Sequence, residues 1–191
     1  LIRLLNPQKG KILLEGKEIQ KIPSIEYAKK VAYLPSQIEL LFSYTVEEFV
    51  MLGRFPYTSR YGGISEKDRE IVENVMEEFE ISRYRKRKIW ELSDGEKQRV
   101  FISQVIAQQS SLVLLDEPTS HLDIGHCFKI MDIIKEVNRR GITIIAVLHE
   151  LNLASEYCTR LLLLNKGSIT SEGTPEQVIT YQNIEDVYET K

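Results

Sequence analysis

The fold is decided by one stretch in the middle of the chain, which reads Leu112-Val113-Leu114-Leu115-Asp116-Glu117-Pro118. A continuous apolar run of this kind is typical of a strand buried on both faces of a parallel sheet. Two adjacent carboxylates follow it, at the edge where open α/β sheets bind ligands. One carboxylate can hold magnesium through water, and the other can deprotonate an attacking water. The pattern therefore indicates phosphoryl transfer. A purely structural interpretation, a strand that ends in a polar turn before a helix, fits the same residues.

The sequence on the C-terminal side continues as alternating helices and strands. A second apolar run, over residues 142–148, is too apolar for a half-exposed strand and predicts another strand covered on both faces. The other elements expected here are helices over 125–139 and 151–157, a strand over 160–164, and a last helix that begins at Thr174. This alternation predicts an α/β fold with a mainly parallel sheet flanked by helices.

The N-terminal side begins with two short strands and then becomes helical. Apolar bursts over 11–14 and 31–34 end at turn residues, as strands do. Thr45 and Ser65 begin capped helices, and the second helix has apolar residues at helical spacing. We therefore expect a single domain over 1–191, with a helical subdomain inserted over 40–92.

Composition and charge narrow the class of protein. Hydrophobic residues make up 42% and charged residues 28%, the balance of a globular domain. The net charge of -3 lacks the basic footprint of a nucleic-acid binder, so no nucleic acid is expected as a partner and the basic segment 83–88 is interpreted as a solvated turn. Cys127 and Cys158 lack the spacing of a zinc site or a disulfide framework. No apolar run is long enough to span a bilayer, so any link to a membrane must come through a partner.

A second motif, Leu92-Ser93-Asp94-Gly95-Glu96-Lys97-Gln98-Arg99, precedes the carboxylate pair. Ser93 followed by Glu96 forms a capping box, which by itself predicts only the start of a helix. A helix N-terminus with a hydroxyl and a glycine is also an anion site, because its unpaired N–H groups and the helix dipole favour phosphate. Both interpretations hold together.

Two further elements complete the pattern. The segment Ser120-His121-Leu122-Asp123 follows the carboxylate pair, and His149 follows the second apolar run, near the same edge of the predicted sheet. A lone histidine at a strand end is usually just a polar terminus. In this order and spacing, however, the four elements resemble the ATP-binding-cassette ATPases, and the resemblance covers the whole chain.

The resemblance implies a P-loop NTPase-like fold that binds ATP and Mg²⁺, and it gives each motif a role. The residues that match the catalytic positions are Asp116 for Mg²⁺, Glu117 as the catalytic base and His149 for the γ-phosphate. The residues that match the family signature and D-loop are Ser93, Asp94, Gly95, Glu96, Ser120 and Asp123. In the family, the signature binds the ATP held by the opposite subunit, so a second ATPase subunit in a homodimer is implied.

Within the family, residues 33–37 and 50–57 are similar to the subunits that power uptake of iron chelates, haem and cobalamin. The partners implied are paired integral membrane permease subunits and, indirectly, a periplasmic or surface substrate-binding protein. The location implied is the cytoplasmic face of the membrane, and the helices around 49–57 are where a coupling helix would dock. Iron(III) chelate is the cargo implied at family level, because selectivity resides in the other subunits.

Three positions depart from the family pattern. No G-x-x-x-x-G-K-[ST] motif occurs, yet residues 1–7 resemble the helix that follows one. Because that loop holds the β- and γ-phosphates, we expect this chain alone to bind ATP poorly and to be inactive. We also expect that it is a truncated reading frame and that the complete subunit hydrolyses ATP.

The other two departures lie at the nucleotide itself. The Q-loop position, counted from Thr45, falls on Ser36; we nominate Gln37, which a bulge of one residue would bring to Mg²⁺ and the nucleotide. Asp94 replaces the first signature glycine, and its charge favours the helix start but repels phosphate.

Two other functions fit parts of the sequence. One is a soluble ABC-type ATPase of translation or DNA repair, although the coiled coil of repair-type members would need heptads that residues 1–93 lack. The other is a non-hydrolytic remnant that offers only its signature face to a complete partner.

Overall fold

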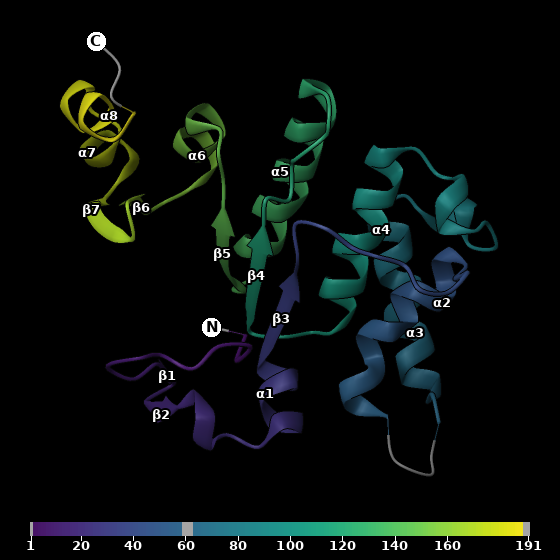
Figure 1. Ribbon diagram of the computed structural model, residues 1–191. Coiled ribbons are helices and arrows are strands. Elements are labelled where there is room, and N and C mark those ends of the chain that lie inside the picture. The colour runs from purple at the N-terminus through teal and green to yellow at the C-terminus, as the bar shows by residue number, and fades with distance from the viewer. Residues whose placement is uncertain (1, 59–62, 189–191) are drawn as a thin grey trace. The chain divides into compact units, whose positions relative to one another are not determined.

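A parallel three-stranded sheet in the order β3-β4-β5 brings three strand ends to one edge of the sheet (Figure 1). The strands are β3 (Val31–Leu34), β4 (Leu112–Asp116) and β5 (Thr143–Val147). Leu34 is paired with Leu115, and Asp116 with Val147, so the strands end almost level. The predicted parallel sheet is confirmed in the computed structural model, and the candidate carboxylates follow its central strand.

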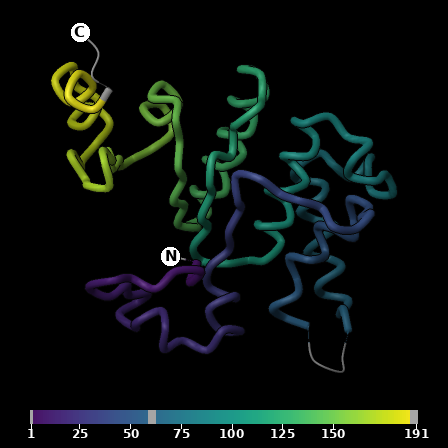
Figure 2. The backbone as a smooth tube through the Cα atoms, in the orientation of Figure 1, coloured from purple at the N-terminus to yellow at the C-terminus, as the bar shows by residue number. Residues whose placement is uncertain are grey.

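The structure describes residues 2–58 and 63–188, which divide into two compact units, Leu1–Val147 and Leu148–Lys191. Figure 2 traces the chain of the first unit from β3 into the helical block and back through α4 (Asp94–Ala107) to β4. After β4 the chain forms α5 (Ile124–Arg139) and returns as β5. No helix of the described ranges has both the length and the apolar character to cross a membrane.

The two apolar strands differ in burial. In β4, Val113 and Leu115 are 1% and 3% exposed, as expected for a strand covered on both faces. In β5, Ile145 and Val147 are 46% and 51% exposed, so the prediction of full cover was wrong for this strand. The reason is positional: β4 lies between two strands, whereas β5 pairs only with β4 among the described residues.

The first thirty residues hold a small hairpin and a helix. Strands β1 (Leu13–Leu14) and β2 (Lys17–Glu18) pair through a turn in which Glu15 and Gly16 have φ angles of 51° and 78°. A 3-10 turn, η1 (Ile19–Lys21), and helix α1 (Ser24–Lys30) follow.

Residues 2–7 are not helical, which corrects the resemblance of 1–7 to a helix; Leu1 lies outside the described residues. Pro7 disfavours helix at the residue before it, and so short a segment cannot nucleate a helix alone. Arg3 instead stacks over the Tyr27 ring at 3.8 Å and donates a hydrogen bond to the Ile22 carbonyl.

The described residues of the segment predicted to be helical, 40–58 and 63–92, form two α-helices and three 3-10 turns. They are α2 (Val46–Met51), η2 (Leu52–Tyr57), α3 (Glu66–Glu78), η3 (Ser82–Tyr84) and η4 (Ile89–Glu91). Thr45 and Ser65 cap the α-helices through complete capping boxes, as predicted.

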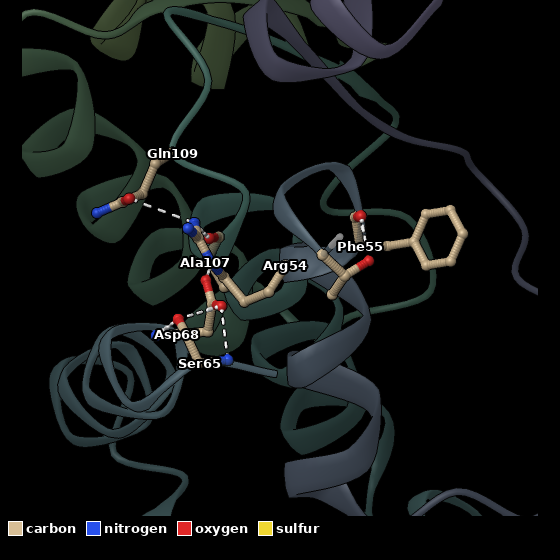
Figure 3. Close-up of polar contacts among 7 residues, drawn as sticks. Arg54, Phe55, Ser65, Asp68, Ala107 and Gln109 are labelled. Atoms are coloured by element: carbon tan, nitrogen blue, oxygen red, sulfur yellow. Dashed lines mark hydrogen bonds and ion pairs between the residues drawn. The ribbon is translucent and has the colours of Figure 1, made fainter. Parts of the chain in front are cut away.

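A buried charge network fixes this block to the far end of α4 (Figure 3). Arg54 is 3% exposed, forms an ion pair with Asp68 at 2.8 Å and donates to the Ala107 carbonyl at 2.7 Å. Gly53 lies so close to α4 that a Cβ there would be 2.2 Å from the backbone oxygen of Gln104.

Residues 148–188, the described part of the second unit, form an antiparallel hairpin and three helices. Its elements are α6 (Leu151–Tyr157), β6 (Leu161–Asn165), β7 (Ser168–Gly173), α7 (Pro175–Val178) and α8 (Tyr181–Tyr188). Thr174 caps α7 as predicted, but α7 has only four residues and is not the last helix, because α8 follows it. Strand β7 was not predicted, because only one residue of its sequence, Ile169, is strongly apolar.

Candidate functional site

The candidate site begins with the two carboxylates at the end of β4. Asp116 is the last residue of the strand, and Tyr33 of the neighbouring β3 donates a 3.4 Å hydrogen bond to its Oδ2. Burial and the charge of Asp116 both raise the pKa of Tyr33 above its ordinary value. Tyr33 therefore stays a hydrogen-bond donor and orients Asp116 at the sheet edge.

Glu117 has an uncommon backbone conformation. Its φ angle is 50°, in the left-handed region that non-glycine residues rarely adopt. Its N–H donates to the Val147 carbonyl at 3.1 Å, and its own carbonyl accepts from both the amide (3.1 Å) and the hydroxyl (2.9 Å) of Ser120. These bonds hold the strained residue in place, which is a common feature of functional sites.

The loop after Glu117 ends at Asp123, which caps α5. Asp123 accepts one hydrogen bond from the backbone N–H of His126 at 2.9 Å and contacts the His126 Nδ1 atom at 2.7 Å. These bonds lower the pKa of Asp123 below its ordinary value. The Cys127 thiol donates to the Thr119 carbonyl, which fixes the loop from its other side.

The motif with Ser93 forms the start of α4, as the capping box predicts. The Glu96 amide donates to the Ser93 hydroxyl oxygen, and a Glu96 carboxylate oxygen accepts from the Ser93 amide at 2.9 Å. Hydrogen bonds from Tyr84 and Ser93 lower the pKa of Glu96 to about 2. Asp94 is exposed and pairs with Lys97 at 3.1 Å, so its charge is partly neutralised on its own helix.

Two contacts join α4 to its neighbours in the site, one to the first turn of α5 and one to the loop after Glu117. Gly95 is buried against the His126 ring, and a Cβ on Gly95 would lie 2.4 Å from His126 Cδ2. One turn further along the helix, the Gln98 side chain donates to the Pro118 carbonyl at 2.7 Å. The structure thus brings the start of α4 close to the loop after Glu117 and to the first turn of α5 within one chain.

Sequence reasoning missed His126 and Gln98. Each had a weak local signal: His126 is three residues after the helix cap Asp123, and Gln98 is three residues after Gly95, on the same side of the helix. Neither signal identifies the group that the side chain contacts, since those groups are distant in the sequence.

Gln37 and Ser36 both lie in the loop that follows β3, and both are exposed. The level ends of β3 and β4 place this loop at the sheet edge that carries Asp116. The choice of Gln37 over Ser36 stays a prediction.

His149 belongs to the second unit, where it is exposed and precedes the N-cap residue of α6, Glu150. Its convergence with Asp116 and Glu117 on one phosphate stays a prediction.

An apolar groove lies on the helical block, away from the carboxylates in sequence. We call it the docking groove; its main lining residues are Phe42, Tyr44, Met51, Leu52, Phe55 and Ile64, and its volume is about 530 Å³. Phe42 and Phe55 are 67% and 72% exposed, which is unusual for two aromatic side chains on one surface.

Comparison with known proteins identifies the family. The family model described as ABC transporter matches residues 1–120. The chain belongs to the ABC transporter family. The petrobactin import ATP-binding protein FpuC of Bacillus anthracis is 37% identical over 189 residues, which cover 98% of this chain and 70% of that protein.

Other members agree in sequence and fold. The iron(3+)-hydroxamate import ATP-binding protein FhuC of Bacillus subtilis (strain 168) is also 37% identical, over 98% of this chain and 70% of its own length. Among solved structures, the dimeric post-hydrolysis state of the ATP-binding cassette MJ0796, bound to ADP and Pi, superposes with a TM-score of 0.75. That match has 27% identity and covers 90% of this chain and 76% of the other. The family prediction and the α/β fold prediction are confirmed.

Proposed function

We propose that this protein is the ATP-binding and ATP-hydrolysing subunit of a membrane importer for iron(III) chelates or a related metal chelate. The observation that carries the proposal is the pair Asp116 and Glu117 at the end of β4, with Glu117 held in a strained backbone conformation. Strain of this kind persists where function requires a fixed side chain. Membership of the ABC transporter family supports ATP as the substrate of this pair.

Asp116 would help to hold Mg²⁺, and Glu117 would accept the proton of the attacking water. Within residues 2–58 and 63–188, no three His, Cys, Asp or Glu side chains converge as a metal site of their own. Mg²⁺ is commonly held by one or two carboxylates together with phosphate oxygens and water, so the oxygens of Asp116 and Gln37 fit it when nucleotide is bound. His149 would contact the γ-phosphate.

The start of α4 would meet the ATP bound by a second copy of the subunit. Ser93, Asp94, Gly95 and Glu96 lie at the N-terminal end of a 14-residue helix, whose dipole favours an anion. Ser120 and Asp123, in the loop that contacts this helix start, would form the rest of the seam. The dimeric arrangement of the related cassette MJ0796 supports a two-subunit form.

The docking groove supports a membrane partner. Exposed aromatic and aliphatic side chains around a groove favour an amphipathic helix as the bound element. A permease subunit that presents such a helix would place this chain at the cytoplasmic face of the membrane, with the substrate-binding protein on the other side. FpuC is named for petrobactin import and FhuC for iron(3+)-hydroxamate import, and these names support an iron chelate as the cargo.

Affinity purification from detergent-solubilised membranes of the native host tests this proposal. The tagged protein should co-purify with an integral membrane protein. Phe55→Ser should lose that protein, because Phe55 is 72% exposed in the groove. Trp90→Ser is the matched control, since Trp90 is 59% exposed but does not line the groove, and it should keep the partner. Co-purification with ribosomes, or equal loss in both variants, contradicts the proposal.

A further inference from the structure

The backbone at Glu117 is held from three directions. Val147 of β5 accepts from the Glu117 amide, and Ser120 of the following loop donates to the Glu117 carbonyl. The third bond comes from α4, where Gln98 Nε2 donates to the Pro118 carbonyl at 2.7 Å. Only this third bond comes from the helix that begins at Ser93.

A left-handed backbone at a non-glycine residue needs more than one restraint to persist. The peptide group between Pro118 and Thr119 carries the oxygen that Gln98 holds, so this bond restrains the turn immediately after Glu117. A shift of α4 along its axis would pull on this oxygen and change the direction in which the Glu117 side chain points. The bond is partly buried, so water replaces it poorly.

A second contact helps to fix the position of α4 relative to the loop, through the first turn of α5. Gly95 packs directly on His126, whose ring is fixed by Asp123 at the start of α5. Because a Cβ at Gly95 has no space, the helix start follows the loop closely. Gln98 and Gly95 therefore attach two successive turns of α4, one to the loop after Glu117 and the other to the first turn of α5.

We infer that Gln98 is a positioning residue that makes the orientation of Glu117 depend on the position of α4. This inference rests on the proposed function for its consequence. In a two-subunit arrangement, the start of α4 faces the ATP of one site while Glu117 of the same chain acts at the other. The Gln98 bond then links the phosphate contact of one site to the catalytic base of the second.

Amide hydrogen exchange measured by NMR tests the restraint without any need for activity. Gln98→Met removes the donor and keeps the side-chain volume, so exchange of the Glu117 and Ser120 amides should become about 3- to 10-fold faster, as expected when one hydrogen bond is lost. Gln98→Lys restores a donor and should return exchange to near the wild-type rate. Gln104→Met, on the same helix and equally half-buried, should change neither amide. Unchanged exchange in Gln98→Met, or no rescue by Gln98→Lys, overturns the inference.

ATP hydrolysis by the full-length subunit is the second readout. Gln98→Met should lower kcat about 10- to 100-fold and leave KM unchanged, because loss of the Gln98 bond displaces the base and not the nucleotide. Faster exchange with an unchanged kcat overturns the positioning role. If Gln98→Met exchanges faster but the wild-type subunit hydrolyses no ATP, the proposed function is overturned and the restraint by Gln98 still holds. If circular dichroism shows that Gln98→Met is unfolded, Gln98→Asn, which shortens the donor by one methylene, replaces it.

Discussion

Replacement of Arg54 by methionine isolates the buried network that joins the helical block to α4. The Arg54 guanidinium pairs with Asp68 at 2.8 Å and donates to the Ala107 carbonyl at 2.7 Å and to Gln109 Oε1 at 3.2 Å. It also stacks over the Tyr57 ring at 4.0 Å. Methionine keeps most of the apolar stem and removes every polar contact.

The free energy of unfolding should fall by about 3 kcal/mol. Removal of one partner from a buried ion pair typically costs about 3 to 5 kcal/mol, because the other charge stays buried without compensation. The lower end applies here, since Asp68 still accepts hydrogen bonds from the amide and hydroxyl of Ser65. These bonds and Arg54 lower the pKa of Asp68, so its carboxylate stays charged at pH 7 and the full penalty is present there.

Urea denaturation at pH 7 measures the effect. A loss of about 3 kcal/mol moves the midpoint by about 1 M or slightly more at typical m-values. Arg139→Met is the control: Arg139 is 67% exposed and its ion pair with Glu136 is a surface pair, so the substitution should cost below about 0.5 kcal/mol. Adding Asp68→Leu to Arg54→Met should destabilise by no more than about 1 kcal/mol further, because no unpaired charge then remains and only the hydrogen bonds from Ser65 are lost. A loss below about 1 kcal/mol in Arg54→Met would show that the Arg54 network contributes little to stability.

Three further predictions concern the start of α4. Gly95→Ala should destabilise the protein by about 1 to 3 kcal/mol through overpacking against His126, and His126→Ala should relieve most of that loss in the double variant. Thermal unfolding of the wild type, the two single variants and the double variant gives the coupling energy, and additive losses contradict the contact. Glu96→Gln should lower the free energy of unfolding by about 1 kcal/mol at pH 7, as for other helix caps. Because the pKa of Glu96 in the folded state is lowered to about 2, this difference from wild type should be full above about pH 5 and should shrink as the pH falls towards 2. Urea titrations at several pH values measure it, and a difference that stays constant with pH contradicts the prediction. Asp94→Gly should raise the ATPase rate of the full-length subunit if charge repulsion of phosphate limits it, and an unchanged rate rules the repulsion out as important.

Local sequence patterns predicted the helix starts well. The four capping boxes at Thr45, Ser65, Ser93 and Thr174 each involve two residues that are three apart, so they can be predicted from local sequence alone. The buried strand that ends at Asp116 was equally clear, because four consecutive apolar residues leave no polar face.

Properties that depend on neighbours were predicted less well. The exposure of Ile145 differs from that of Leu114, although both lie in apolar runs, because one strand is central and the other has a single neighbour. In the site, Asp116 and Glu117 were located from sequence. The contacts from Tyr33 to Asp116 and from Gln98 to the Pro118 carbonyl, next to Glu117, were not, because an alternating pattern of helices and strands does not show which distant side chains meet.

The most direct test of the account compares phosphate release from ATP by the full-length subunit and by its Glu117→Gln variant. Glutamine has the size of glutamate but cannot accept the proton from water. The account predicts that Glu117→Gln lowers the rate by about 10² to 10⁴ while ATP still binds, as measured by equilibrium filter binding. Phosphate release at the wild-type rate in Glu117→Gln would contradict the assignment of Glu117 as the base, and with it the proposed reaction at the end of β4.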